Sequence, residues 1–328
     1  MYVMYRKVIV PLDGSQLAEG VLPHVAELIR GRGTQVCLLS VAPLMKGIAS
    51  NAADTHPRPG STREERQRIK AELLEYLQTV AKRLEPVAAD LQASVRFGRP
   101  AEAILAFSGE VGADLIAMSA HGRSGIGRWV FGSVADRVLR GAPCPVLLVR
   151  AGRAQLRTTY QRILVPLDGS ELAEQVLPYV KALICPQRPP TVEEDPRGGT
   201  RVFLVSVLTT GLGDRTVALL TSYPPGLRLA TTALHHAEIQ LRSYLRSVAT
   251  ALREQGTTVT IAVRRGSPAD EILAYAAEVE ADLIGMTTHG FSGVSRWVYG
   301  NVAARVLQGA YSPVLLVRST SEQGGDEV

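Results

Sequence analysis

SAHGRSGIGRWVFGS, at residues 119–133, joins a strand-like apolar run to a segment with helical spacing. The preceding run ADLIAM, residues 113–118, is typical of a buried strand, and residues 133–140 read as a helix. Glycines at positions 122, 125 and 127 allow a sharp turn and let a ligand approach the backbone. A helix that begins after such a loop presents unpaired N–H groups and the positive end of its dipole. This junction therefore predicts a cradle for an anion such as phosphate.

The same stretch returns as TTHGFSGVSRWVYGN at residues 287–301, so the chain contains an internal repeat. A second repeated segment, VPLDGS, occurs at residues 10–15 and 165–170. The copies are 155 residues apart at the aspartate of VPLDGS and 168 residues apart at the histidine of the glycine-rich loop. The second copy is therefore longer by 13 residues, and most of these lie in the Pro-rich segment 186–199. We predict one domain at residues 1–152, a second at 153–318, and a disordered acidic tail at 319–328.

Apolar runs alternate with segments of helical spacing in each copy. In the first copy we expect strands at residues 7–12, 34–41, 91–97, 114–118 and 146–149. We expect helices after residue 15, at 63–84, from residue 100, and at 133–140, with loops at 43–62 and, in the second copy, 209–232. This alternation predicts two tandem doubly wound, Rossmann-like parallel sheets of five strands, with helices on both faces. Ligands bind such sheets at the carboxyl ends of the strands.

Composition excludes several classes of function. The 328 residues include 46% hydrophobic and 20% charged residues, which is ordinary for a globular protein. The net charge of +5 comes without a basic run, and aromatics are only 5%, so we expect no nucleic-acid partner. No apolar run reaches the roughly 18–20 residues of a membrane helix. Three scattered cysteines without CxxC spacing favour neither a disulfide framework nor zinc, and a cytoplasmic location is expected.

With the repeat established, the chain resembles the universal stress protein (UspA) family, as two copies in tandem. The residues that carry the resemblance are VPLDGS at 10–15, GRPA at 98–101, HGRSG at 121–125, Gly132-Ser133 and PCPVLLV at 143–149. Members of this family that bind ATP carry glycine, two residues, glycine, nine residues, then glycine with Ser or Thr. This chain has Ser119 or Thr287 at the first glycine, and the second copy ends in Gly300-Asn301.

The resemblance implies binding of ATP or a related adenine nucleotide, with Mg2+ as counter-ion, more in domain 1 than in domain 2. It places Asp13 and Asp168 at the ribose and base, and the backbones of Val41 and Val207, just past the second strand, at adenine. The full set of expected nucleotide-binding residues is Pro11, Asp13, Val41, Ser119, His121, Gly122, Arg123, Gly132, Ser133, Pro166, Asp168, Val207, Thr287, His289, Gly290, Gly300 and Asn301.

Each of these residues also has a purely structural interpretation. The glycines can simply shape a turn, and an Asp before Gly-Ser can stabilise the turn itself. Ser133-x-x-Asp136 matches a capping box, in which the serine hydroxyl would satisfy the amides of its own helix. The two loop histidines, at 121 and 289, have neither triad partners nor metal spacing in the sequence. We therefore expect no enzyme activity beyond slow ATP hydrolysis.

Two further expectations concern partners. The final strands, at 146–149 and 314–317, would leave open sheet edges, and pairing them across a pseudo-twofold would cover both. We therefore predict an internal pseudo-dimer, with a further homodimer as an extension, and a protein partner of unknown identity. The alternative hypothesis is a degenerate scaffold that binds no nucleotide and works through protein–protein interaction, because Ser119 and Thr287 replace the family glycine.

Overall fold

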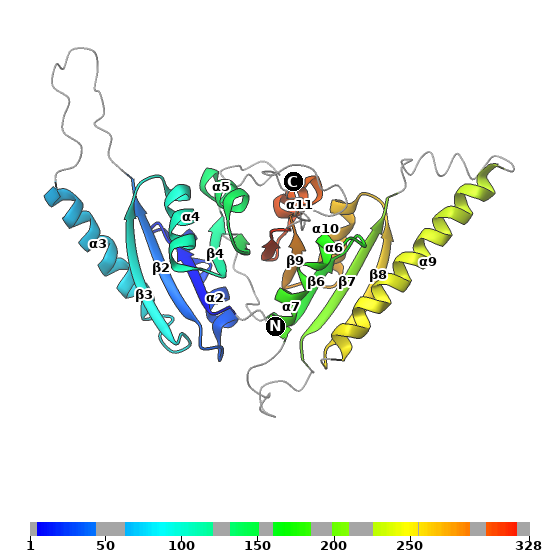
Figure 1. Cartoon of the computed structure of the whole chain (residues 1–328), viewed down its shortest axis with the longest axis horizontal. Coiled ribbons are helices and arrows are strands. Elements are labelled where there is room, and N and C mark those ends of the chain that lie inside the picture. Colours follow the sequence, from blue (N-terminus) through cyan, green and yellow to red (C-terminus); the bar gives the residue numbers. More distant parts are fainter. Residues whose placement is uncertain are drawn as a thin grey trace, which may run out of the picture. The chain divides into compact units, whose positions relative to one another are not determined.

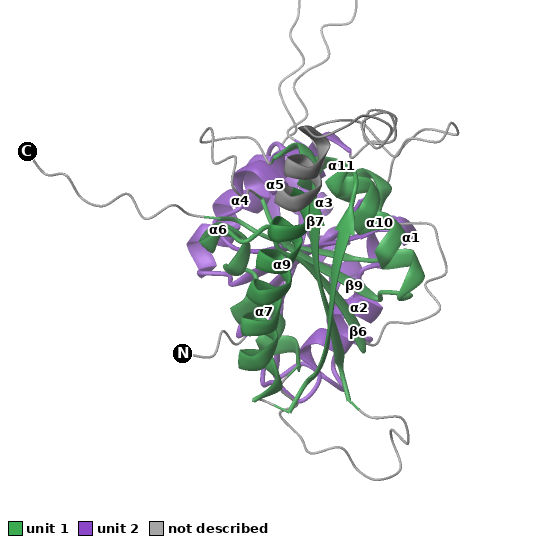
Figure 2. Cartoon of the chain, turned by 90° about the vertical axis from the view of Figure 1, so that its right-hand side faces the viewer, with its two compact units in different colours: residues 1–3, 156–328 green, residues 4–155 purple. Residues whose placement is uncertain are grey.

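The chain forms two compact units, one of residues 4–155 and one that contains residues 156–328 (Figure 2). The computed structural model describes residues 5–43, 63–120, 132–150, 160–184, 199–209, 226–254, 256–288 and 300–319, with side chains of 226–233 excepted. The loops predicted at 43–62 and 209–232 and the insertion at 186–199 lie largely outside these ranges. None of the helices described is both long and apolar enough to cross a membrane.

The first unit alternates strands with helices along the chain (Figure 1). Its strands pair in parallel in the order β3-β2-β1-β4-β5. The elements are β1 (Lys7–Pro11), α1 (Gln16–Glu19), α2 (Leu22–Ile29), β2 (Gln35–Ala42), α3 (Arg63–Ala81), β3 (Asp90–Phe97), α4 (Pro100–Val111), β4 (Leu115–Ala120), α5 (Ser133–Gly141) and β5 (Val146–Arg150).

The second unit repeats this arrangement, with parallel strands in the order β8-β7-β6-β9-β10. The elements are β6 (Arg162–Pro166), α6 (Glu171–Glu174), α7 (Leu177–Ile184), β7 (Arg201–Leu208), α9 (Gly226–Arg253), β8 (Thr258–Arg265), α10 (Pro268–Glu278), β9 (Leu283–Thr287), α11 (Asn301–Gly309) and β10 (Val314–Val317). The predicted fold class is confirmed in both units, whereas the pseudo-twofold between them stays a prediction.

The order of the strands places the helices on both faces of each sheet. The chain runs outward from β1 through β2 to β3, then returns past β1 to β4 and continues to β5. Because crossovers between parallel strands are right-handed, α1, α2 and α3 cover one face, and α4 and α5 cover the other. Direct packing of α4 on α5 and of α10 on α11 agrees with this assignment. The direction reverses between β1 and β4, which is where ligands bind in such sheets.

The central strands are buried on both faces, as their continuous apolar sequences predict. Val8, Ile9 and Val10 of β1 are fully buried, and so are Ile163, Leu164 and Val165 of β6. At the amino edge of the sheet, Asp114 accepts hydrogen bonds from the N–H groups of Arg6 and Lys7. Asp282 does the same for Gln161 and Arg162 in the second unit. These aspartates fix the entry of β1 and β6 at the edge opposite the predicted site.

One predicted element differs from the structure. The helix expected after residue 15 is broken into α1 and α2, because the chain turns at Gly20 and Val21. Ser319, which we assigned to the disordered tail, is hydrogen-bonded to Thr288, while residues 320–328 lie outside the described part of the chain.

Candidate functional site

A cavity of about 310 Å³ lies in the first unit, where the carboxyl ends of β1, β2 and β4 meet the start of α5. All six predicted site residues of this unit that the structure describes line it: Pro11, Asp13, Val41, Ser119, Gly132 and Ser133. Most of the remaining wall is apolar, and sequence reasoning did not identify it: Leu12, Ala18, Leu39, Pro100, Ile104, Met118, Ala120, Val134 and Ala135.

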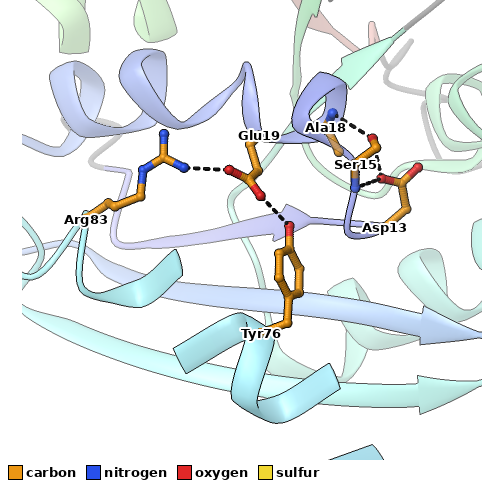
Figure 3. Close-up of polar contacts among 6 residues, drawn as sticks. All are labelled: Asp13, Ser15, Ala18, Glu19, Tyr76 and Arg83. Atoms are coloured by element: carbon orange, nitrogen blue, oxygen red, sulfur yellow. Dashed lines mark hydrogen bonds and ion pairs between the residues drawn. The ribbon is translucent and has the colours of Figure 1, made fainter. Parts of the chain in front are cut away.

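Asp13 lies in a tight turn that follows β1 (Figure 3). Gly14 has φ +84°, in the left-handed region, so a glycine is needed here. Oδ1 of Asp13 accepts from the Ser15 N–H at 3.0 Å and from Ser15 Oγ at 2.6 Å. Ser15 Oγ in turn accepts from the Ala18 N–H at 3.1 Å and caps α1. The turn-stabilising role that we considered for Asp13 is therefore present, and it is carried by Oδ1.

Val41 lies inside β2, not just past it as predicted, yet its backbone faces the cavity. The C=O of Leu39 accepts from the Leu12 N–H at 2.8 Å, and the C=O of Ala42 accepts from the Gly98 N–H at 2.9 Å. In a parallel strand the backbone N–H and C=O groups of successive residues point alternately to the two neighbouring strands. The backbone groups of Val41 therefore point to the same side as those of Leu39, toward β1, which has already ended at Pro11. Among the described residues no hydrogen-bond partner for these groups occurs.

The start of α5 contributes unpaired donors to the cavity wall. Gly132 is the N-cap, and Ser133 is the first helical residue, without a side-chain cap. The N–H groups of residues 132–135 have no acceptor within the described ranges. The predicted capping box is wrong, because Ser133 lies one position too late to cap. Asp136 instead forms an ion pair with Arg140, with N–O distances of 2.9 and 3.1 Å.

Ser119, at the position of the family glycine, lines the cavity but does not expose its hydroxyl there. Its Oγ is buried and has no hydrogen-bond partner in the described part of the chain. A Cβ placed on Gly20 would lie 3.6 Å from this Oγ, so the hydroxyl points toward the end of α1. Neither Ser119 nor Thr287 has a positive φ. The backbone at this position therefore does not require glycine.

A network that sequence reasoning missed holds α3 against α1 near Asp13 (Figure 3). The Tyr76 hydroxyl donates to Glu19 Oε1 at 3.1 Å, and Arg83 Nη1 pairs with Glu19 Oε2 at 2.6 Å. Burial, the adjacent carboxylate of Glu19 and the charge of Asp13 raise the pKa of Tyr76. The sequence contained one indication of this network: Tyr76 and Arg83 are seven residues apart, so they lie on the same face of the predicted helix.

The second unit keeps the frame of this site. Gly169 has φ +88°, and Asp168 Oδ1 accepts from the Ser170 N–H at 3.0 Å and from its Oγ at 2.6 Å. Val207 lies inside β7, again not past it, and faces the β6 side, since the C=O of Val205 accepts from the Leu167 N–H. Asn301 is the first residue of α11, after the N-cap Gly300.

Pro166 is the last residue of β6, and Thr287 is the buried last residue of β9. The other predicted residues cannot be placed. His121, Gly122, Arg123, His289 and Gly290 lie outside the described residues. Within the described ranges no group of three or more His, Cys, Asp or Glu side chains could hold a metal ion. Burial raises the pKa of Cys144 to about 12, so this thiol is not an activated nucleophile at neutral pH.

The reversal of strand order places each unit in the class of doubly wound, Rossmann-like α/β domains, and in the first unit a cavity lies at the carboxyl ends of the strands, where such domains bind ligands. A family model for the universal stress protein family matches residues 4–150 and 159–318. The chain therefore belongs to the universal stress protein family, as two copies in tandem.

Individual relatives agree with this assignment. A universal stress protein from Methanocaldococcus jannaschii is 30% identical over 147 residues, which are 45% of this chain and 83% of the relative. One from Mycobacterium bovis is 25% identical over 241 residues, 72% of this chain and 73% of the relative. The crystal structure of a universal stress protein from Archaeoglobus fulgidus has the same fold, with a TM-score of 0.67 and 20% identity; the match covers 98% of this chain and 99% of that one.

Proposed function

We propose that the cavity of the first domain binds an adenine nucleotide, with ATP as the expected ligand, and that the protein is a regulator that responds to this ligand. The observation that carries the proposal is the row of N–H groups at residues 132–135, which have no acceptor among the described residues and form one wall of a mostly apolar cavity. A helix start of this kind attracts anions, whereas apolar walls attract a flat base.

The dimensions and chemistry of the cavity fit such a ligand. About 310 Å³ lies at the lower end of the ~300–1,000 Å³ typical of small-molecule sites. Leu39, Ile104 and Met118 offer apolar surface for a base, and the backbone of Val41 offers a donor and an acceptor. Asp13 is exposed beside these groups and can accept from ribose hydroxyls.

The phosphates would lie at the start of α5. Gly132 and Ser133 match the last part of the family's ATP motif, and both are exposed. Mg2+ would be held chiefly by the phosphates themselves and by water, as this ion prefers. The burial of the Ser119 hydroxyl supports the proposal over the degenerate scaffold, because the residue that replaces the family glycine adds no exposed polar atom to the ligand space.

The test is isothermal titration of the nucleotide-stripped full chain with ATP, ADP and AMP, using Ser133→Pro and Ser133→Ala. Proline is well tolerated at the first helical position, and Gly132 has ψ 149°, which a following proline accepts. Ser133→Pro removes an N–H without breaking the helix, whereas Ser133→Ala removes only the hydroxyl.

We expect Ser133→Pro to weaken ATP binding at least tenfold, because a hydrogen bond to a charged group contributes about 1.5–3 kcal/mol. Ser133→Ala should cost only a few-fold, and AMP should bind more weakly than ATP. Unchanged affinity in Ser133→Pro would contradict the role of the helix start. No binding of any adenine nucleotide to the wild-type chain would leave the scaffold hypothesis in its place.

A further inference from the structure

The two units have nearly the same residues around the site, so the few differences stand out. Of the residues that line the first cavity, most are identical at the equivalent positions of the second unit. The exceptions are Leu39, Ser119, Ala120 and Ser133, which are replaced by Val205, Thr287, Thr288 and Asn301. Among them, the change from Ala120 to Thr288 introduces a hydroxyl and a methyl group where the first unit has only a Cβ.

Thr288 is tied down on several sides. Its N–H donates to the C=O of Val317 at 2.9 Å, directly after β9. Its Oγ1 accepts from the Ser319 N–H at 3.2 Å and lies 3.2 Å from Ser319 Oγ. Its C=O accepts from the N–H of Gly300, the N-cap of α11, at 2.8 Å. Only 6% of Thr288 is exposed.

The first unit cannot form this set of contacts. Ala120 has no hydroxyl, and the position equivalent to Ser319 is Ala151, which has none either. The N–H of Gly132 has no acceptor among the residues described, whereas the N–H of Gly300 already donates to Thr288. One of the donors that would hold a phosphate in the first unit is therefore occupied in the second.

We propose that Thr288, held by Ser319, is the specificity-determining residue that closes the second site, so that the chain binds one nucleotide, in the first domain. The hydroxyl contacts to Ser319 hold the C=O of Thr288 against the start of α11. This inference rests on the proposed nucleotide binding of the first domain.

The test pairs reciprocal variants of the full chain. Thr288→Ala with Ser319→Ala removes the hydroxyl contacts from the second unit, and Ala120→Thr introduces the larger residue into the first. Titration with ATP gives the number of sites, and amide hydrogen exchange of the ligand-free chain reports the Gly300 N–H without any nucleotide. Circular dichroism verifies that each variant is folded.

We expect one ATP per wild-type chain, two in Thr288→Ala/Ser319→Ala, and at least tenfold weaker binding in Ala120→Thr. Without ligand, Gly300 should exchange at least tenfold more slowly than Gly132, and the double variant should reduce this difference. Binding of two ATP per wild-type chain, or equal amide hydrogen exchange at Gly132 and Gly300, would contradict the closure of the second site. Neither result would contradict the proposed nucleotide binding of the first domain. Loss of all ATP binding, with the exchange difference intact, would instead overturn the proposed function and with it the selection between sites.

Discussion

The two domains share the contacts that build the frame of the site and differ in the contacts that a ligand would meet. The turns at Asp13 and Asp168 have the same hydrogen bonds with the same distances. Ser40 and Ser206 each donate to the carbonyl that precedes this turn, at 2.8 and 2.6 Å. In contrast, the N-cap amide of α5 has no acceptor in the described ranges, and that of α11 donates to Thr288. A repeat can therefore retain its architecture while one copy has an N–H group of its helix start occupied by the protein itself.

A second difference lies where the long helix meets the first short one. In the first domain, Glu19 binds both Tyr76 and Arg83. The second domain keeps Glu174 and Tyr244, but Ala251 replaces the arginine. The Tyr244 hydroxyl is buried without a hydrogen-bond partner in the described part of the chain, although burial and the nearby Glu174 raise its pKa. The second copy thus keeps the glutamate and the tyrosine of this network but lacks the arginine.

The largest stability difference between the domains is expected at Asp282. Burial raises the pKa of Asp282 to about 6, against a usual value near 3.8. The folded state then holds this proton more tightly than the unfolded state, so the free energy of unfolding falls as pH rises from about 4 to about 6 and is constant above. A pKa difference of about two units between the folded and unfolded states corresponds to a change of about 3 kcal/mol in the free energy of unfolding. Burial also raises the pKa of Asp114, which is less buried, so its contribution should have the same sign and be smaller.

Asp282→Asn should remove most of this dependence on pH, and Asp114→Asn only a small part. The measurement is the urea midpoint of each full-chain variant from pH 4 to pH 7. Equal slopes in the two variants would show that the amino edges of the two sheets are electrostatically alike.

The tyrosines of the long helices should give a smaller difference. Tyr76→Phe removes a hydrogen bond to the Glu19 carboxylate, and we expect a loss of about 1–2 kcal/mol in the free energy of unfolding. Tyr244→Phe removes a buried hydroxyl without a described partner, so it should be neutral or slightly stabilising. Urea unfolding of both variants tests this pair. A cost for Tyr244→Phe that matches that of Tyr76→Phe would mean that Glu174 binds the hydroxyl after all.

The smallest effect is expected at Arg83. Its side chain is 52% exposed, so its ion pair with Glu19 contributes at most about 0.5–1 kcal/mol. Arg83→Ala should lower the urea midpoint slightly at low salt and less at high salt. Ala251→Arg, at an exposed position, should give the second domain a gain of similar size. A loss in Arg83→Ala that does not change with salt would show that the arginine acts through packing.

The fold could be predicted from the sequence because its signals are local. Continuous apolar runs at β1 and β4, and helical spacing in α3, decide the element types without tertiary information. The break at Gly20 was missed because Leu17, Val21 and Val25 continue the helical spacing through it. The position of the two units relative to one another depends on contacts between distant residues, which periodicity does not encode.

The site was predicted in part, for a physical reason that differs between residues. Asp13 and Gly132 follow from strand ends and from a glycine-rich loop, so the sequence marks them. The capping assignment of Ser133 failed because a helix start shifted by one residue changes which side chain can cap. The significance of Thr288 could not be predicted, because its partner Ser319 comes from the far side of a strand crossover.

The amino edge of the second sheet has a practical consequence. Helix α7 ends at Ile184 and β7 begins at Arg201, so the extra residues of the second copy are inserted at the amino edge of the sheet. Asp168 and Thr287 lie at the opposite edge, where β6 and β9 end. An insertion there lengthens the chain at the edge of the sheet that lies away from the carboxyl ends of the strands. The same position is suited to carrying a fluorophore or an affinity tag.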